Sequence, residues 1–217
     1  MTEPRTLKID FVSDVVCPWC AIGLAALETA LVNVADTVQA ELHFQPFELN
    51  PQMPPEGEDI VEHLMRKYGS TPEQIAHNQA AIRARGEALG FTFRKEGRGR
   101  TYNTFDAHRL LHWAGLEGRQ TQLKHALLGA YFTAGENPSS HEVLLRAAAT
   151  SGLDVDEAQR VLSSGEYANE VREREQFYLA QGINGVPAVI VNDRHLIQGG
   201  QPVEVFEQAL RQIAAAA

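Results

Sequence analysis

The sequence predicts an α/β fold into which a large helical domain is inserted, and three observations support this. The chain opens with a strand, a helix and a second strand (residues 7–47), and it closes with two strands and a helix (residues 183–217). Between them, apolar residues recur mostly at the three- and four-residue spacings of helices. The two cysteines, Cys17 and Cys20, lie where the first strand gives way to the first helix.

The opening part is predicted as strand, helix and strand. Residues 7–16 are mostly apolar and rich in Val, which is typical of a strand. Residues 22–34 carry apolar side chains at helical spacing, so Cys17 is expected at the N-cap. Pro18 then falls in the first turn, where its missing N–H costs nothing. Residues 41–47 predict the second strand.

Helix starts are visible in the middle of the chain. Residues 71–74 (Thr-Pro-Glu-Gln) fit a capping box, with a helix running to Leu89. Asn103 or Thr104 can cap the next helix, residues 139–142 fit a second capping box, and a last helix runs from about Glu166 to near Gly182. The Gly- and Arg-rich residues 94–100 predict a solvated loop, with contact to an anion or a substrate as the alternative.

The closing part is predicted as a β-hairpin followed by a helix. Residues 186–191 are a β-branched run, residues 192–194 supply a turn, and residues 195–197 return. Pro187 fits the start of this strand because proline has no N–H to donate. The whole pattern predicts a thioredoxin fold interrupted by an all-helical domain. The expected boundaries are 1–50 and 180–217 for the thioredoxin-like domain and 51–179 for the insertion.

Composition limits the class of protein. The apolar fraction of 44% and the charged fraction of 22% are those of an ordinary globular chain. A net charge of −9 argues against nucleic acid and anionic membrane as partners. No stretch approaches the ~18 apolar residues of a membrane span, and Met1 to Arg5 show no signal-peptide core. With two cysteines only, we expect a cytoplasmic protein whose CxxC is catalytic rather than structural.

The position of the cysteines predicts a reactive dithiol. Free N–H groups and the helix dipole stabilise an anion at a helix N-terminus, which lowers the pKa of a cysteine there. Cys17 is therefore expected to attack, and the more buried Cys20 to resolve the mixed disulfide. Two alternatives stay open: an inert structural pair, and half of a zinc site completed by His108 and His112. The second needs two further ligands and no second CxxC exists, so we predict no metal.

Five segments in this order make the chain resemble the DsbA family of thiol–disulfide oxidoreductases, and most closely its FrnE-like branch. The similarity covers essentially the whole length. The segments are Ser13-Asp14-Val15-Val16-Cys17-Pro18-Trp19-Cys20, Pro46-Phe47-Glu48-Leu49-Asn50-Pro51, Asn103-Thr104-Phe105-Asp106-Ala107-His108-Arg109-Leu110, Gly185-Val186-Pro187 and Gln198-Gly199-Gly200-Gln201-Pro202.

The resemblance implies that Val186–Pro187 is a cis peptide facing the dithiol and that its backbone pairs with a polypeptide substrate. Without the resemblance, a trans proline at a strand entry is the simpler interpretation. Pro18 and Trp19 are expected to tune the reduction potential.

The remaining candidates have less certain roles. Phe47 and Leu49 are expected to wall the groove beside the dithiol. His108 and Arg109 either line the cleft or pack at the domain junction, and Asn103 is a helix cap or a substrate contact. Asp14 is expected to raise the pKa of the nearby cysteine through its charge.

The expected activity is exchange of disulfides with protein substrates, as an oxidoreductase or isomerase that needs no cofactor. Glutathione or thioredoxin is the expected reductant, and a homodimer is compatible with the sequence. One alternative is a glutathione-dependent isomerase or transferase of the hydroxychromene-carboxylate isomerase and kappa type, in which a serine usually replaces the first cysteine. The other is a non-enzymatic redox-sensing or chaperone-like binding module.

Overall fold

The computed structural model describes residues 3–54 and 56–216. In this part of the chain the main sheet has four strands in the order β2-β1-β5-β6. β1 and β2 are parallel, whereas β5 is antiparallel to β1 and β6 is antiparallel to β5. The strands span Arg5–Ser13 (β1), Val38–Pro46 (β2), Ala188–Val191 (β5) and His195–Gln198 (β6).

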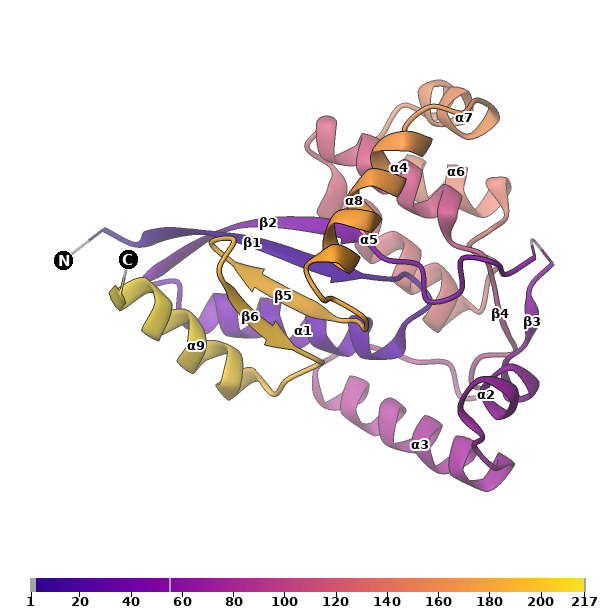
Figure 1. The fold of residues 1–217 in the computed structure, drawn as a ribbon, viewed down its shortest axis with the longest axis horizontal. Coiled ribbons are helices and arrows are strands. Elements are labelled where there is room, and N and C mark those ends of the chain that lie inside the picture. The colour runs from indigo at the N-terminus through magenta and orange to yellow at the C-terminus, as the bar shows by residue number, and fades with distance from the viewer. Residues whose placement is uncertain (1–2, 55, 217) are drawn as a thin grey trace.

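Both faces of the sheet are covered by helices. Successive residues of a strand point to opposite faces, so Phe11 and Val12 face different layers. Phe11 belongs to the main core, to which α1 (Pro18–Asn33) and α9 (Val203–Ala216) contribute side by side (Figure 1). Val12 packs instead in a smaller cluster with Tyr178 of α8 (Ala168–Ala180). The helices thus exclude water from both sides of the strand that leads to Cys17.

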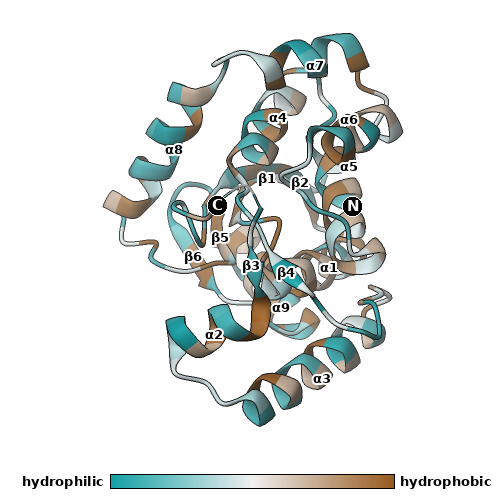
Figure 2. Ribbon diagram, turned by 90° about the vertical axis from the view of Figure 1, so that its right-hand side faces the viewer, coloured by the Kyte–Doolittle hydropathy of each residue, from teal (hydrophilic) through white to brown (hydrophobic). Residues whose placement is uncertain are grey.

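The segment between β2 and β5 forms two groups of helices, which Figure 2 shows on opposite sides of the sheet end. One group is α2 (Ile60–Tyr68) and α3 (Pro72–Ala88). The other is α4 (Phe105–Leu116), α5 (Gln120–Leu128), α6 (His141–Thr150), α7 (Val155–Ser163) and α8, with a π-helical turn at Gly129–Ala134. A two-residue antiparallel pair, β3 (Glu58–Asp59) and β4 (Arg100–Thr101), interrupts the otherwise helical insertion.

The predicted thioredoxin fold with a helical insertion is confirmed, although strand limits differ. β1 ends at Ser13 rather than Val16, because the Asp14 carbonyl accepts the Cys17 N–H and turns the chain there. β2 begins at Val38, three residues earlier than predicted, because it pairs with β1 over nine residues in register. The domain boundaries 1–50, 51–179 and 180–217 remain predictions, and residues 1, 2, 55 and 217 lie outside the described residues.

Of the two predicted capping boxes, one is confirmed and one is wrong. At α3, the Thr71 side chain accepts the Gln74 N–H and the Gln74 side chain accepts the Thr71 N–H. At α6, Ser140 is the N-cap but its side chain makes no capping bond. The Ser139 hydroxyl donates instead to the Asn103 carbonyl at 2.6 Å. A tertiary contact has therefore replaced the local one that the sequence pattern predicted.

Candidate active site

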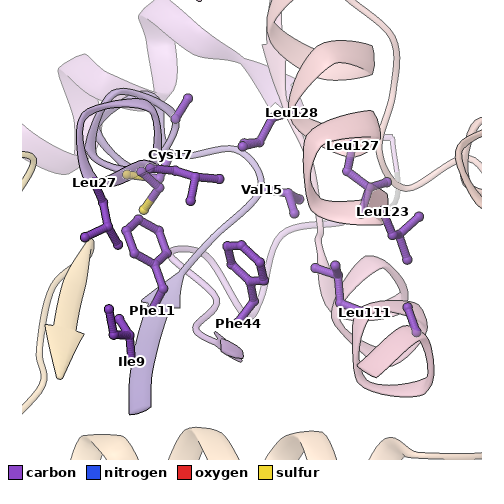
Figure 3. Close-up of a cluster of buried hydrophobic side chains, with 14 of the residues drawn as sticks. Ile9, Phe11, Val15, Cys17, Leu27, Phe44, Leu111, Leu123, Leu127 and Leu128 are labelled. Carbon is purple, nitrogen blue, oxygen red and sulfur yellow. The ribbon is translucent and has the colours of Figure 1, made fainter. Parts of the chain in front are cut away.

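Cys17 lies at the N-cap of α1, in extended conformation, with Pro18 as the first helical residue. Its carbonyl accepts the N–H groups of Cys20 and Ala21, at 3.1 and 3.3 Å, which is the normal start of a helix. Figure 3 shows Cys17 beside Phe11, at the edge of the main core. Both cysteines are free thiols; Cys17 is 4% exposed and Cys20 is fully buried. The strand and the helix together fix the two sulfurs at one end of the core.

The two thiols have opposite pKa shifts. The hydrogen bond from the Cys20 thiol lowers the pKa of Cys17, and the Cys20 N–H and the Arg98 guanidinium act in the same direction. Burial and the negative charge of Asp14 oppose the shift without reversing it. Burial, together with the bond and charge of Cys17, raises the pKa of Cys20 well above its ordinary value. Cys17 is therefore the better nucleophile of the pair.

The Val186–Pro187 peptide faces this dithiol and is cis. The Cys17 thiol donates to the Val186 carbonyl, with 3.7 Å between sulfur and oxygen. Gly23 of α1 allows the close approach, because a Cβ at this position would lie 3.1 Å from the Pro187 ring and 3.3 Å from Gly200 Cα. The sequence segments around Cys17, Pro187 and Gly200 thus meet in space.

A groove opens beside Cys17 and occupies about 390 Å³. We call it the dithiol groove. It is formed by the start of α1, the loop after β2, the α2–α3 pair and the Val186 segment. Its lining residues are Cys17, Pro18, Trp19, Leu49, Leu64, Tyr68, Ser70, Ile75, Asn78, Gln79, Ile82, Arg98 and Val186. Most of them are apolar or uncharged, so the groove suits an uncharged or apolar segment of a ligand.

Two arginines at the groove were not predicted as site residues. Arg98 comes from the Gly- and Arg-rich loop, lines the dithiol groove and approaches the Val16 carbonyl at 3.4 Å. The Arg85 guanidinium lies 5.5 Å from the centre of the Trp19 ring and donates to the Gly200 carbonyl at 2.6 Å. Arg85 thereby ties α3 to the thioredoxin-like part. The Gly- and Arg-rich composition of residues 94–100 was the sequence feature that pointed to Arg98. No sequence feature pointed to Arg85.

Beneath the dithiol lies a buried Asp14–His108 pair. Asp14 Oδ2 accepts the Leu49 N–H at 2.7 Å, and its Oδ1 lies 3.5 Å from His108 Nε2. Burial alone would raise the pKa of Asp14, but the His108 imidazole and the Leu49 N–H lower it. His108 Nε2 is buried without a hydrogen-bond partner among the described residues. His108 therefore faces Asp14 and does not line the dithiol groove.

Two other predicted residues, Phe47 and Asn103, do not line the dithiol groove, whereas Leu49 does. Phe47 packs with Val12 and Tyr178 under α8, so the expectation that it walls the groove is wrong. Leu49 packs against the same cluster but also lines the dithiol groove, as predicted. The Asn103 side chain accepts the Phe105 N–H at 2.9 Å and donates to the Met53 carbonyl at 3.2 Å, as a helix cap does.

Arg109 is also structural. It is 3% exposed and donates to the carbonyls of Glu166, Val161 and Ser164 and to the carboxylate of Asp106. The first three carbonyls lie at the end of α7 and in the loop that follows it. Arg109 therefore packs at a junction inside the helical domain and does not reach the dithiol groove.

The carboxylates of Glu48 and Glu175 predict that the stability of the protein depends on pH. Glu48 and Glu175 share one cation, Arg172. Burial and the charge of Glu175 raise the pKa of Glu48 to about 7. A carboxyl whose pKa is raised by folding stabilises the folded state below its unfolded pKa of about 4.5. This stabilisation is lost as the pH rises through the folded pKa of about 7.

Replacing this carboxyl removes the loss. The wild type loses stability between pH 5 and pH 8, and Glu48→Gln does not. We therefore expect the free energy of unfolding of Glu48→Gln, relative to that of the wild type, to increase by about 2 kcal/mol over this range. Urea unfolding at both pH values measures this. Glu173→Gln is the control. Glu173 is exposed on α8, the helix that carries Arg172 and Glu175, and its replacement should cause no such change. A pH-independent difference for Glu48→Gln would contradict the assignment.

Neither a metal centre nor a membrane span emerges from the described residues. In residues 3–54 and 56–216, no three His, Cys, Asp or Glu side chains are grouped so that they can hold a metal ion. His108 and His112 thus do not join the cysteines. Within the same ranges, no helix is long and apolar enough to cross a bilayer.

An α/β fold with this insertion and a dithiol at the start of α1 defines a thioredoxin-like protein of the DsbA type. The family model of the DSBA-like thioredoxin domain matches residues 8–211, and the chain belongs to that family. The protein YwbO of Bacillus subtilis is 26% identical over 206 residues, which cover 94% of this chain and 96% of YwbO.

Solved structures agree with this placement. A probable DsbA oxidoreductase from Streptomyces coelicolor is 34% identical and superposes with a TM-score of 0.89 over 97% of this chain and 90% of its own. A 2-hydroxychromene-2-carboxylate isomerase shares the fold at 15% identity, with a TM-score of 0.73 over 97% of this chain and 99% of its own. The FrnE-like branch stays a prediction.

Proposed function

We propose that this protein exchanges disulfides with extended polypeptide segments, through the Cys17–Cys20 dithiol and without a cofactor. The observation that carries the proposal is the Cys17 thiol at the N-terminus of α1, 3.7 Å from the Val186 carbonyl and open to the dithiol groove. A strand-like substrate can pair with the backbone at Val186 while its side chains enter the groove. The family membership supports the same chemistry.

In the reductive direction, the Cys17 thiolate attacks one sulfur of a substrate disulfide. That S–S bond breaks, the other substrate sulfur leaves as a thiolate and takes a proton from solvent, and a mixed disulfide to Cys17 forms. Cys20 loses its proton and attacks the Cys17 sulfur, which releases the second substrate thiol and leaves a Cys17–Cys20 disulfide. Two glutathione thiols then restore the dithiol and become glutathione disulfide. The reverse sequence oxidises a substrate dithiol.

The glutathione-dependent isomerase or transferase remains the second candidate, since the fold is shared with such an isomerase. The presence of both cysteines favours exchange, because conjugation or isomerisation with bound glutathione needs no Cys20. A cytoplasmic setting, glutathione or thioredoxin as the reductant, a binding role without turnover and a homodimer also remain predictions.

The test uses a peptide with one intrachain disulfide. Mixed with reduced protein in the absence of glutathione, it should lose its disulfide in proportion to the protein added, while the protein gains a Cys17–Cys20 disulfide. Peptide mapping by mass spectrometry measures both. A peptide that stays oxidised while Cys17 reacts only with added glutathione would refute exchange and favour the second candidate.

A further inference from the structure

A second cavity, on the side of Asp14 and His108 away from the groove, is lined by basic side chains. It lies between β2, α4, α5 and α8 and has a volume of about 220 Å³. Five of its lining residues carry basic nitrogen atoms: His43, His108, His112, Lys124 and Arg174. None of the described residues that line it carries a carboxylate. The chain as a whole is acidic, with a net charge of −9, so its overall charge does not explain a cavity lined by basic side chains.

The innermost basic group of this cavity is unusual. Lys124 is 1% exposed, and the contact found for its ammonium is the Phe44 ring, 5.7 Å away at the centroid. No carboxylate of the described residues lies within ion-pair distance of Lys124. Leaving a buried ammonium without a partner is expensive, so such groups are usually paired or bind a ligand. His108, also almost fully buried, lines the same cavity wall, but its Nε2 faces Asp14 Oδ1 at 3.5 Å.

The rim of the cavity carries a further free cation. Arg174 is exposed and has no ion pair in the described ranges, whereas Arg172, two residues earlier, is held by two glutamates. His43 on β2 is also exposed, and His112 is half-buried. The cavity therefore offers an arginine at the entrance, a lysine at the base and imidazoles along the walls. Gln120, which also lines it, is already bonded to the backbone of Phe44.

We propose that this basic cavity binds a small oxyanion, a phosphate or carboxylate compound of a few carbon atoms, between Arg174 and Lys124. Guanidinium and ammonium groups recognise such anions by charge-assisted hydrogen bonds, which are the strong ones. The site is distinct from the dithiol groove, with which it shares no lining residue. The volume admits an organic chain besides the anionic head.

Titration calorimetry tests the site at pH 7 and constant ionic strength, with inorganic phosphate, glycerol 3-phosphate and succinate as probes. We expect at least one probe to saturate with a dissociation constant of about 1 mM or lower. Tighter binding of the phosphates or of succinate identifies the head group. No saturable binding of any probe below roughly 10 mM would overturn the proposal.

Two arginine variants provide the matched comparison. Arg174→Gln should weaken binding on the order of tenfold, because it removes one charge-assisted contact. Arg194→Gln removes an equally exposed arginine from the β5–β6 turn and should leave the affinity unchanged. Equal effects of the two variants would mean non-specific attraction and would also overturn the site. Both positions are exposed, so neither variant should unfold the protein.

Discussion

Replacing Cys17 by serine should abolish disulfide exchange, whereas replacing Cys20 by serine should trap the protein in mixed disulfides. Cys17 carries the lowered pKa and borders the dithiol groove, so it supplies the nucleophile. Cys20 is fully buried with a raised pKa and can reach only the sulfur of Cys17. Without it, the mixed disulfide has no intramolecular route to release.

The measurement is exchange with the disulfide peptide, followed by non-reducing electrophoresis and mass spectrometry. We expect the rate of Cys17→Ser to fall to the uncatalysed level, and a covalent peptide adduct to accumulate on Cys20→Ser. Ser13→Ala, a buried neighbour outside the dithiol, serves as the control for general disturbance of the site. If Cys20→Ser forms no adduct, or if Cys17→Ser stays active, the assignment of nucleophile and resolving thiol is wrong.

Replacing Arg109 by methionine should destabilise the protein strongly without changing the chemistry of Cys17. The guanidinium is buried and satisfies carbonyls at the end of α7, where a helix exposes unpaired acceptors. Methionine fills the space but donates nothing, so these acceptors lose their partners inside the protein. We expect a loss of about 3 kcal/mol or more.

Thermal unfolding measures this effect, and the melting temperature should fall by roughly 6–12 °C. Arg146→Met is the matched control. Arg146 makes two ion pairs at the surface, each of which contributes about 0–1 kcal/mol. The rate of Cys17 alkylation at 25 °C should be the same in Arg109→Met as in the wild type. A large change in that rate, with little loss of stability, would show that Arg109 acts on the site instead.

Local signals predicted much of the fold. Cys17 is the N-cap, Thr71 and Gln74 form the capping box, and the turn at residues 192–194 joins β5 to β6. Each of these depends on residues close together in the sequence. The cis geometry of Val186–Pro187 was different, because only the family resemblance implied it. Nothing in the local sequence separates a cis from a trans proline at a strand entry.

The residues that were missed owe their positions to tertiary contacts. Arg98 reaches the dithiol groove from a loop whose course depends on α2 and α3 packing nearby. Ser139 bonds to Asn103, 36 residues earlier, instead of capping its own helix. The burial of Lys124 could have been predicted from the sequence, because Lys124 lies one turn before Leu127 and Leu128 on the apolar side of α5. A lysine among apolar residues at helical spacing indicates a buried charge, but it does not indicate the cavity beside it.

The central claim is that Cys17 and Cys20 form a reversible disulfide. Equilibration of the purified protein in glutathione buffers of graded potential, with thiols trapped and counted by mass, tests it directly. We predict a two-electron transition that joins Cys17 to Cys20, with a midpoint between about −270 and −120 mV, the values of thioredoxin and DsbA. A protein that keeps both thiols across this range, or that carries only a stable glutathione adduct on Cys17, would contradict the account.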